Sequence, residues 1–322
     1  MPRWWLADTW PSRLLAPLGH LFAALAALRR RAYRSGLLRS QRLPVPVIVV
    51  GNILVGGTGK TPFVVHLISE LKARGRHPGV VCRGYGGRAE QWPVRVTPDS
   101  SPGEVGDEPV LLARRCGAPV AAGPNRAAAG RMLIDRAGCD LVVLDDGLQH
   151  YRLRRDLEIA VNDAERRLGN GRCLPAGPLR EPPRRLKEVD LVLINGIQDE
   201  SAPGFRLEGR TLLAVDGKGR ERSLEDLRGR TVHAVAGIGH PRRFFTQLEA
   251  AGVRVLPHPF PDHYAFTPAD LSFADERTVV MTEKDAVKCA TFAGEDVWYL
   301  AVTARMNDAG GAELGRILDT LS

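Results

Sequence analysis

The clearest chemistry in this sequence of 322 residues lies in a glycine-rich run, GNILVGGTGKT, at residues 51–61. In such a run the backbone N–H groups can point at phosphate oxygens, Lys60 can reach the terminal phosphates of a nucleotide, and the Thr61 hydroxyl can ligate Mg²⁺. The strict phosphate-loop pattern has glycine at position 54, where this chain has leucine, but the doubled glycine before Thr58 compensates. We therefore predict a nucleotide and Mg²⁺ site formed by Leu54, Val55, Gly56, Gly57, Thr58, Gly59, Lys60 and Thr61.

Two carboxylates, Asp145 and Asp146, follow the apolar run 141–144. A wholly apolar run is typical of a central strand in a parallel sheet, and ligands bind at the carboxyl edge of such sheets. Carboxylates at this edge can hold the metal ion of a nucleotide, and Gln149 and His150 can extend the site. A simple Asp-Asp-Gly turn between two elements is the alternative interpretation.

The elements around these residues predict an α/β fold. Residues 45–50 are apolar and rich in valine, as in a buried strand, and the apolar residues after Thr61 recur at helical spacing. The expected fold is a doubly wound parallel sheet containing the P-loop, with a second, smaller α/β domain. Further strands are expected at 157–162, 190–195, 211–215, 231–239, 278–282 and 297–302.

The chain divides into three expected parts. Proline, glycine and charge combine at 198–212, which predicts a boundary there. We expect an N-terminal amphipathic, membrane-associated segment over 1–42, a P-loop domain over 43–210 and a smaller C-terminal α/β domain over 211–322.

The N-terminal segment contains an apolar run of 15 residues at 14–28, which is too short to span a bilayer. Its leucines recur at alternating spacings of four and three, as on one face of a helix, with tryptophans before the run and arginines after it. We interpret it as a helix lying on an anionic membrane surface. A helix packed on the protein's own surface is one alternative. A secretory signal peptide is the other, but the arginine cluster and the downstream nucleotide motif argue against it.

Composition and charge support this division. Hydrophobic residues make up 44% of the chain and charged residues 25%, as in soluble globular proteins, which argues against disorder and against a multi-span membrane protein. The net charge of +8 lies within residues 1–69, which hold nine basic side chains and one acidic. No nucleic-acid recognition signature accompanies it, so we expect the surplus to face a membrane.

Cysteine and lysine usage add two expectations. The five cysteines have no paired spacing, so we predict reduced thiols in the core and neither a zinc site nor a disulfide framework. In this arginine-rich chain lysine is rare, which draws attention to the places where it is kept. It occurs only at positions 60, 72, 187, 218, 284 and 288.

Seven motifs occur together and in order along nearly the whole chain. They are GNILVGGTGKTP, RGYGGR at 83–88, GDEP at 106–109, LDDGLQH at 144–150, NGRCLPAGPLREP at 170–182, HPFPDHYAF at 258–266 and TEKDAVK at 282–288. The set resembles the tetraacyldisaccharide 4'-kinases, the lipid A 4'-kinases of Gram-negative bacteria. The resemblance implies transfer of phosphate from ATP to the 4'-hydroxyl of a tetraacylated glucosamine disaccharide 1-phosphate, forming lipid IVA in lipopolysaccharide biosynthesis. It implies Mg²⁺, a lipid A disaccharide precursor and the anionic cytoplasmic face of the bacterial inner membrane as partners, without nucleic acid or an obligate protein partner.

The same resemblance implies a catalytic Asp–His dyad at Asp107 and His263. The aspartate would accept the hydroxyl proton while the histidine orients it, and Lys60 would stabilise charge on the transferred phosphoryl group. From the residues alone, Asp107 can equally be a helix cap and His263 a locally hydrogen-bonded loop residue.

The remaining candidates surround the phosphates. Glu181 joins Thr61, Asp145 and Asp146 as a candidate metal ligand, and the alternative for Glu181 is a surface turn bounded by prolines. The candidate substrate contacts are Arg83, Arg126, Gln149 and Arg180, although most arginines in so arginine-rich a chain are expected to be solvated.

A membrane-associated P-loop ATPase that switches conformation is the alternative function. It would share the glycine loop and the surface helix. It gives no reason, however, for the motifs around Asp107, Glu181 and His263.

Overall fold

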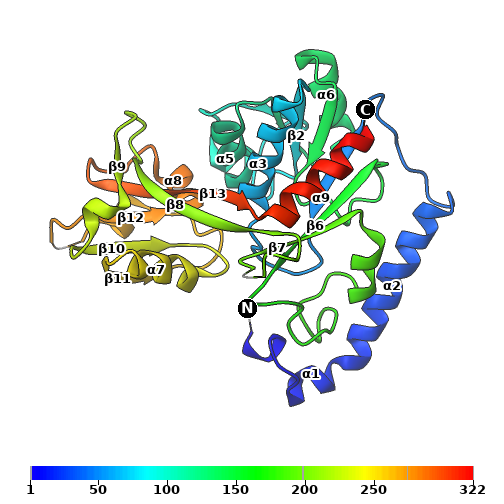
Figure 1. The fold of residues 1–322 in the computed structure, drawn as a ribbon, viewed down its shortest axis with the longest axis horizontal. Coiled ribbons are helices and arrows are strands. Elements are labelled where there is room, and N and C mark those ends of the chain that lie inside the picture. The colour runs from blue at the N-terminus through cyan, green and yellow to red at the C-terminus, as the bar shows by residue number, and fades with distance from the viewer. Residues whose placement is uncertain (1, 198, 274, 322) are drawn as a thin grey trace.

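The computed structural model describes residues 2–197, 199–273 and 275–321. Within them the strands form one sheet of 13 members (Figure 1). The strands are β1 (Val47–Gly51), β2 (Pro78–Cys82), β3 (Val94–Val96), β4 (Val120–Ala122), β5 (Leu141–Leu144), β6 (Leu157–Asp163), β7 (Leu191–Asn195), β8 (Gly204–Ala214), β9 (Glu221–Ser223), β10 (Thr231–Ala236), β11 (Arg254–Pro259), β12 (Val279–Thr282) and β13 (Val297–Met306).

Helices cover both parts of this sheet. They are α1 (Trp10–Leu14), α2 (Ala16–Arg34), α3 (Lys60–Ala73), α4 (Pro102–Val105), α5 (Asp107–Cys116), α6 (Arg126–Ala137), α7 (Pro241–Ala250), α8 (Glu283–Cys289) and α9 (Asp308–Leu318). Short 3₁₀ turns lie at Arg3–Trp5, Pro183–Glu188, Leu224–Leu227, Pro268–Leu271 and Asp319–Leu321.

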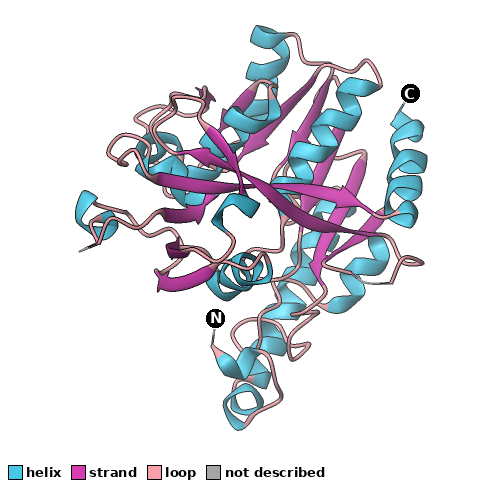
Figure 2. Cartoon of the chain, turned by 60° about the vertical axis from the view of Figure 1, so that its left-hand side comes forward, coloured by secondary structure: helices cyan, strands magenta, loops and turns pink. Residues whose placement is uncertain are grey.

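The strand order is β11-β10-β12-β13-β8-β7-β6-β1-β5-β2-β4-β3, with β9 paired to β8. Strands β7, β6, β1, β5, β2 and β4 are parallel, and so are β11, β10, β12 and β13. The long strands β8 and β13 pair antiparallel and cross the middle of the molecule, where they join the two parallel parts (Figure 2). The predicted α/β fold with a P-loop is confirmed, and its two parts share one sheet.

The segment expected to be a linker is largely a strand. Residues 204–212 belong to β8, which pairs with β7 through Ile194 and Gly204 and with β13 along most of its length. The side chains of Phe205 and Leu212 are fully buried and fix the ends of β8, whereas the charged residues between them lie at the surface. Charged residues and glycines are typical of loops, but a half-exposed strand also accepts them. The composition of this segment therefore did not distinguish a loop from a strand. The division at 210 and 211 falls inside β8 and stays a prediction.

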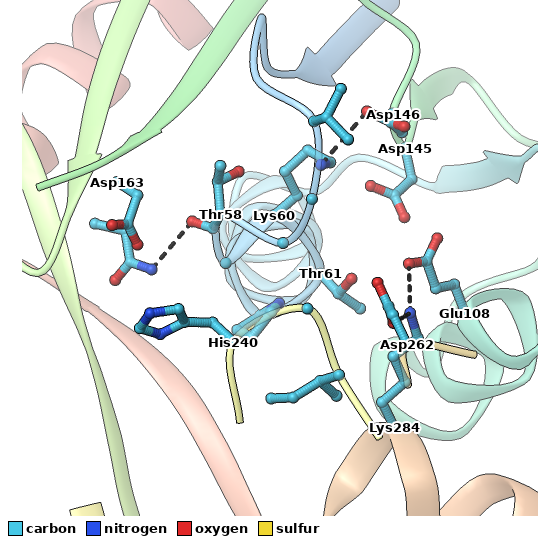
Figure 3. Close-up of a pocket in the computed structure, with 18 of the residues that line it drawn as sticks. Thr58, Lys60, Thr61, Glu108, Asp145, Asp146, Asp163, His240, Asp262 and Lys284 are labelled. Carbon is cyan, nitrogen blue, oxygen red and sulfur yellow. Dashed lines mark hydrogen bonds and ion pairs between the residues drawn. The ribbon is translucent and has the colours of Figure 1, made fainter. Parts of the chain in front are cut away.

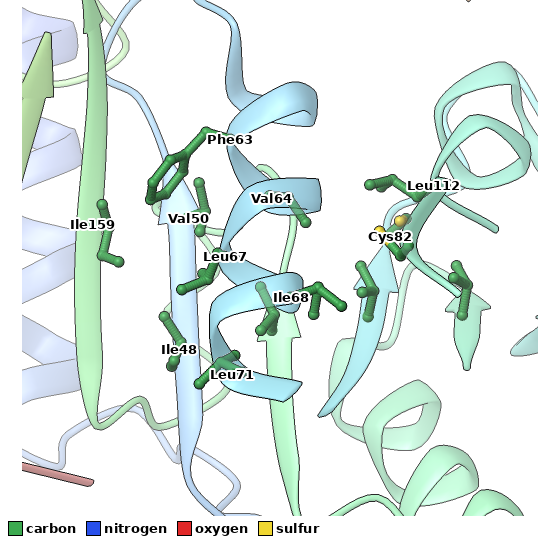
Figure 4. Packing of buried hydrophobic residues seen from close by; sticks show 14 of the residues in the cluster. Ile48, Val50, Phe63, Val64, Leu67, Ile68, Leu71, Cys82, Leu112 and Ile159 are labelled. Atoms are coloured by element: carbon green, nitrogen blue, oxygen red, sulfur yellow. The ribbon is translucent and has the colours of Figure 1, made fainter. Parts of the chain in front are cut away.

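The P-loop helix is anchored by a continuous apolar cluster. One face of α3, carrying Phe63, Val64, Leu67, Ile68 and Leu71, is buried against β1 and its neighbours (Figure 4). Burial of apolar surface at about 25 cal/mol per Å² makes this packing the main force that fixes the start of α3 over the sheet edge. The five cysteines are buried and free of disulfides, as predicted.

Helix α2 packs on the protein through its small residues rather than its leucines. Gly19 lies so close to the loop after β6 that a Cβ there would stand 2.8 Å from Cβ of Ala176. The leucine stripe faces outward, so packing of that stripe on the protein's own surface is wrong. Every exposed large apolar side chain recorded for the described residues, except Tyr85, belongs to residues 6–38. In the part of the chain that the structure describes, no helix is both long enough and apolar enough to cross a membrane.

Candidate active site

The glycine loop connects β1 to α3 and is braced from two sides. Gly56 and Gly59 have φ angles of 95° and 85°, which glycine adopts without strain. The Asn52 side chain donates to Oγ1 of Thr58 at 3.2 Å, and the Asn195 side chain from β7 donates to the Thr58 carbonyl at 3.0 Å. The loop is therefore held in shape by neighbouring side chains (Figure 3).

Leu54, the departure from the strict glycine pattern, has a structural role. Its side chain is 1% exposed and packs in the core on the opposite face of the sheet from α3. Leu54 also bridges Leu179, and the amide of Val55 donates to the Pro178 carbonyl at 2.9 Å. The first part of the loop is thus tied to residues 178–179, and no glycine is required at position 54.

Lys60 and Asp146 meet at the mouth of the loop. Nζ of Lys60 lies 3.4 Å from Oδ1 of Asp146, whose other oxygen lies 3.0 Å from Nη1 of Arg180. Although burial opposes ionisation, the charges of Lys60 and Arg180 hold the pKa of Asp146 far below its usual range. Asp146 is therefore a carboxylate that holds two cations, Lys60 and Arg180, beside the glycine loop.

Asp145 points into the same region but is not paired. It is 3% exposed, and its Oδ1 has no hydrogen-bond partner among the described residues. Burial raises the pKa of Asp145 to about 7, and the nearby Glu108 carboxylate adds to that shift. A buried carboxylate oxygen without a donor fits a cation supplied with a nucleotide. The part of the chain that the structure describes contains no group of three or more acidic, histidine or cysteine side chains that could hold a metal alone.

Glu181 lies in a network of donors. It is 3% exposed and accepts from Gln149 at 2.9 Å and from the Tyr151 hydroxyl at 2.7 Å. Arg30 from α2 and Arg185 each approach it at 3.4 Å. These contacts occupy the carboxylate with donors, which disfavours Glu181 as a metal ligand.

The candidate dyad is assembled from two distant segments. Asp107 begins α5, and its Oδ2 lies 3.1 Å from Nδ1 of His263 in the loop after β11. His263 has a φ of 59°, a conformation that is uncommon outside glycine and often marks a functional position. Lys284 from α8 stands beside the pair, 3.3 Å from Nε2 of His263.

The ionisation of the dyad follows from these contacts. The hydrogen bond to Asp107 raises the pKa of His263 above its ordinary value. Burial alone would raise the pKa of Asp107, but the hydrogen bond from His263 and the charge of Lys284 lower it overall. Asp107 is therefore ionised at neutral pH.

Most of the predicted site residues line one cavity of about 1240 Å³. It is bounded by the P-loop from Val55 to Thr61, and by Arg83, Asp145, Asp146, Gln149, Arg180, Glu181 and His263. Four predicted residues are not in the wall. Leu54 lies in the core, Asp107 lies behind His263, and the buried Arg126 donates to the Gly123 carbonyl at 3.1 Å. His150, expected to extend the site, is not among the residues that line the cavity.

The cavity also contains residues that sequence reasoning missed. Glu108, Asp262 and Lys284 lie in the cavity wall near the dyad. His240, the residue before α7, and Arg243 within α7 also line the cavity. Lys284 could have been found because its motif and the rarity of lysine both drew attention to it. Arg243 carried no such signal, because its partner Asp163 is 80 positions away, at the end of β6.

Comparison with known proteins finds relatives along nearly the whole chain. The family model for tetraacyldisaccharide-1-P 4'-kinase matches residues 11–321. The tetraacyldisaccharide 4'-kinase of Alkalilimnicola ehrlichii is 56% identical over 314 residues, covering 96% of this chain and 94% of the relative. The enzyme of the same name from Pseudomonas aeruginosa is 50% identical over 294 residues, covering 90% and 88%.

A solved structure extends the comparison to three dimensions. The Aquifex aeolicus LpxK, crystallised in complex with ATP, superposes with a TM-score of 0.80 at 28% identity and covers 96% of this chain and 99% of its own. The family match over almost the whole length, the high identities and the shared fold agree. The chain belongs to the tetraacyldisaccharide-1-P 4'-kinase family.

Proposed function

We propose that this chain transfers the γ-phosphoryl group of ATP to the 4'-hydroxyl of a tetraacylated glucosamine disaccharide 1-phosphate, working at an anionic membrane surface. The product is lipid IVA. One observation supports the lipid acceptor above all others: the cavity that holds the P-loop continues onto α2. Phe22, Leu25, Ala26 and Arg29 line the same cavity as Lys60 and His263. An apolar wall with an arginine next to a phosphate site suits an acylated, phosphorylated sugar.

The reaction is an in-line phosphoryl transfer. The sugar hydroxyl oxygen forms a bond to the γ-phosphorus, the bond from that phosphorus to the bridging oxygen breaks, and ADP leaves. Catalysis of such a step is mostly positioning and stabilisation of charge. Lys60 supplies a cation at the start of α3, and the backbone of the glycine loop supplies donors.

The hydroxyl proton passes to the Asp107–His263 pair. Because His263 lines the cavity and Asp107 lies behind it, we assign proton acceptance to the imidazole and orientation to the carboxylate. This reverses the two roles expected from the family resemblance. The carboxylate also stabilises the imidazolium that forms.

Thr61 and Asp145 are the residues that we assign to Mg²⁺. The Thr61 hydroxyl follows Lys60 at the start of α3, and Asp145 offers the unpartnered buried oxygen described above. The ion, when bound with ATP, would supply neutralisation of phosphate charge. Asp146 is already paired with Lys60 and Arg180, so we assign it to positioning those cations.

Transfer to lipid, measured directly, tests the proposed function. The purified full chain in mixed micelles would receive γ-labelled ATP and the disaccharide lipid, and the label would be followed by thin-layer chromatography. We expect label in the lipid and little free phosphate. Release of free phosphate without labelled lipid would favour the alternative, a conformational switch ATPase.

The substitution Asp107→Asn should lower kcat on the lipid about 100-fold, because asparagine can present an N–H to Nδ1 of His263 and so favour the wrong tautomer. The affinity for ATP, measured by calorimetry, should stay within about twofold, since Asp107 makes no recorded contact with the P-loop. Glu104→Gln removes the same charge from an exposed position three residues earlier and should leave both quantities unchanged. Equal turnover in the two variants would contradict the dyad assignment.

The leucine stripe of α2 should govern membrane binding. Leu21 and Leu28 are 56% and 64% exposed and do not line the cavity. Replacing both with glutamine should lower partitioning into anionic vesicles at least about tenfold, because each leucine contributes on the order of 1 kcal/mol when buried in an interface. Glutamine at the exposed Ala312 of α9 is the control. Unchanged flotation of the double variant with vesicles would contradict the membrane role.

A further inference from the structure

Lys284 stands among acidic groups beside the dyad. It is the third residue of the TEKDAVK motif and one of only six lysines in the chain. Its Nζ lies 3.2 Å from Oε1 of Glu108 and 3.3 Å from Oδ1 of Asp262 (Figure 3). Oδ2 of Asp107 is 3.8 Å away. The Lys284 side chain is 17% exposed, whereas those of Glu108 and Asp262 are 38% and 36% exposed, so solvent screens these two pairs in part.

The start of α8 fixes Lys284 in this place. The Thr282 hydroxyl caps the helix by accepting from the Asp285 amide at 3.3 Å. The fully buried Asp285 carboxylate in turn accepts from the Gly237 amide at 2.8 Å. Lys284 is therefore carried by a helix end that is tied to the strand β10 region, and its position does not depend on a mobile loop.

The contact with His263 has a chemical consequence. Burial alone would lower the pKa of Lys284, but Glu108, Asp107 and Asp262 raise it above its usual range, so the group is an ammonium at neutral pH. An ammonium has donors and no acceptor. At 3.3 Å from Nε2 it can bond to His263 only if that nitrogen carries a lone pair. The ring proton then sits on Nδ1, where it is donated to Asp107 at 3.1 Å.

We propose that Lys284 is a positioning residue of the phosphoryl-transfer site, which holds the proton of His263 on Nδ1 and keeps Nε2 free to accept the proton of the substrate hydroxyl. This inference rests on the proposed function, because it assigns a role within the same reaction. When the hydroxyl takes the place of the ammonium at Nε2, Lys284 keeps Glu108 and Asp262 as partners. It can therefore give up His263 without being left buried and unpaired.

The sign of the effect follows from the charges that face His263. Asp107 and Glu108 come from α5, Asp262 from the loop of His263 itself, Lys284 from α8, and the Tyr85 ring lies 5.1 Å away. Of these groups only Lys284 is a cation, and it opposes protonation of the imidazole. Its removal therefore makes the imidazolium easier to form. In a variant without Lys284, the His263 imidazole is therefore protonated, and unable to act as a base, up to a higher pH than in the intact protein.

Lysine suits this position better than arginine. An ammonium is a compact point charge that can turn between three acidic groups and a ring nitrogen, whereas a guanidinium is a planar fork with fixed directions. The chain uses arginine for nearly all its other cations, and Arg180 beside Asp146 shows that it does so within the same cavity.

The pH dependence of kcat/KM tests the proposal. The acidic limb reports protonation of the dyad, and in Lys284→Met we expect it to move up by about one pH unit, with kcat at pH 7 lower by about tenfold. Lys284→Arg should keep the limb near its original pH because the charge remains. Lys218→Met removes one charge from an exposed site and should leave the profile unchanged. An unshifted limb in Lys284→Met would overturn the proposal. Lys284→Gln serves the same comparison if the methionine variant does not fold.

A second measurement does not depend on lipid phosphorylation. Nitrogen-15 shifts of labelled histidine report which ring nitrogen carries the proton, and the His263→Gln variant identifies the signal among the eight histidines. We expect the Nδ1–H tautomer in the intact protein, and a higher imidazole pKa in Lys284→Met. The Nε2–H tautomer in the intact protein would overturn the inference. Absence of lipid phosphorylation by the intact protein would instead overturn the proposed function, whatever the tautomer.

Discussion

Replacing Lys60 with methionine should lower kcat/KM for ATP about 1000-fold, the largest loss of activity that we expect from one substitution. A cation placed at the transferred phosphoryl group acts on charge that develops in the transition state, and loss of about 4 kcal/mol corresponds to a factor of this size. The Lys60 side chain is 12% exposed, so water cannot replace it well. The measurement is initial-rate kinetics with labelled ATP and lipid in mixed micelles.

Asp146 is shared between Lys60 and Arg180, which decides how Lys60 can move. Lys60 lies against Asp146, but Asp146 is also held by Arg180 at 3.0 Å, so it stays paired when Lys60 turns toward a phosphate. Lys60→Arg should therefore fail to rescue activity, because a planar fork at the start of α3 cannot reproduce the same movement. Most of the loss should appear in kcat, with a smaller change in ATP affinity.

Lys72→Met is the matched control for Lys60→Met. Lys72 lies on the same helix and donates to the carbonyl of Cys116 at 3.0 Å, away from the cavity. It should change kcat/KM by less than about threefold. A similar loss in both variants would mean that α3 had been disturbed as a whole, and would contradict the assignment of Lys60 to phosphoryl transfer.

The local parts of the site could be predicted from the sequence because their residues are neighbours in the chain. The strand, glycine loop and helix around Lys60 follow from spacing alone, as does Asp145 after its apolar strand. Leu54 shows the limit of the pattern. Its bridge to Leu179 spans more than a hundred residues, so no local motif explains why leucine stands there.

The parts of the site that depend on packing could not be predicted in the same way. His263 meets Asp107 across 156 positions, and only the family resemblance brought them together. The exposed stripe of α2 was predicted as a membrane surface, but the use of its alanine and glycine face for packing was not, since small residues carry little signal in a hydrophobic pattern. The pairing of β8 with β13 was missed because charged residues obscured the alternation of a strand that is exposed in the middle.

Arg30 connects the N-terminal helix to the active site, and its loss should have the largest effect on stability. Its side chain is 9% exposed and lies 3.4 Å from Glu181 and 2.8 Å from Glu188. Glu181 contacts Gln149, which also donates to the carbonyl of Asn52 at the start of the glycine loop. Helix α2 and the glycine loop therefore share one buried network.

Arg30→Met should lower the free energy of unfolding by about 2 kcal/mol, because the buried Glu181 carboxylate keeps Arg185 and its neutral donors but loses one of the two cations that offset its burial. Arg34→Met is the matched control on the same helix. Arg34 also pairs with Glu188, but it is 66% exposed and does not contact Glu181, so its loss should be a small fraction of that for Arg30. Urea denaturation of the full chain in detergent, followed by tryptophan fluorescence, measures both.

The double variant Arg30→Met with Glu181→Gln separates the charge effect from simple loss of packing. If the destabilisation arises from an uncompensated carboxylate, then neutralising Glu181 in the Arg30→Met background should recover part of the lost stability, although Glu181→Gln alone is destabilising. Strictly additive losses would contradict this account. Because Arg30 is part of the buried network, deletion of residues 1–30 would disturb the candidate active site along with the exposed leucine stripe. Point substitutions on the outer face of α2 are therefore the way to separate membrane binding from catalysis.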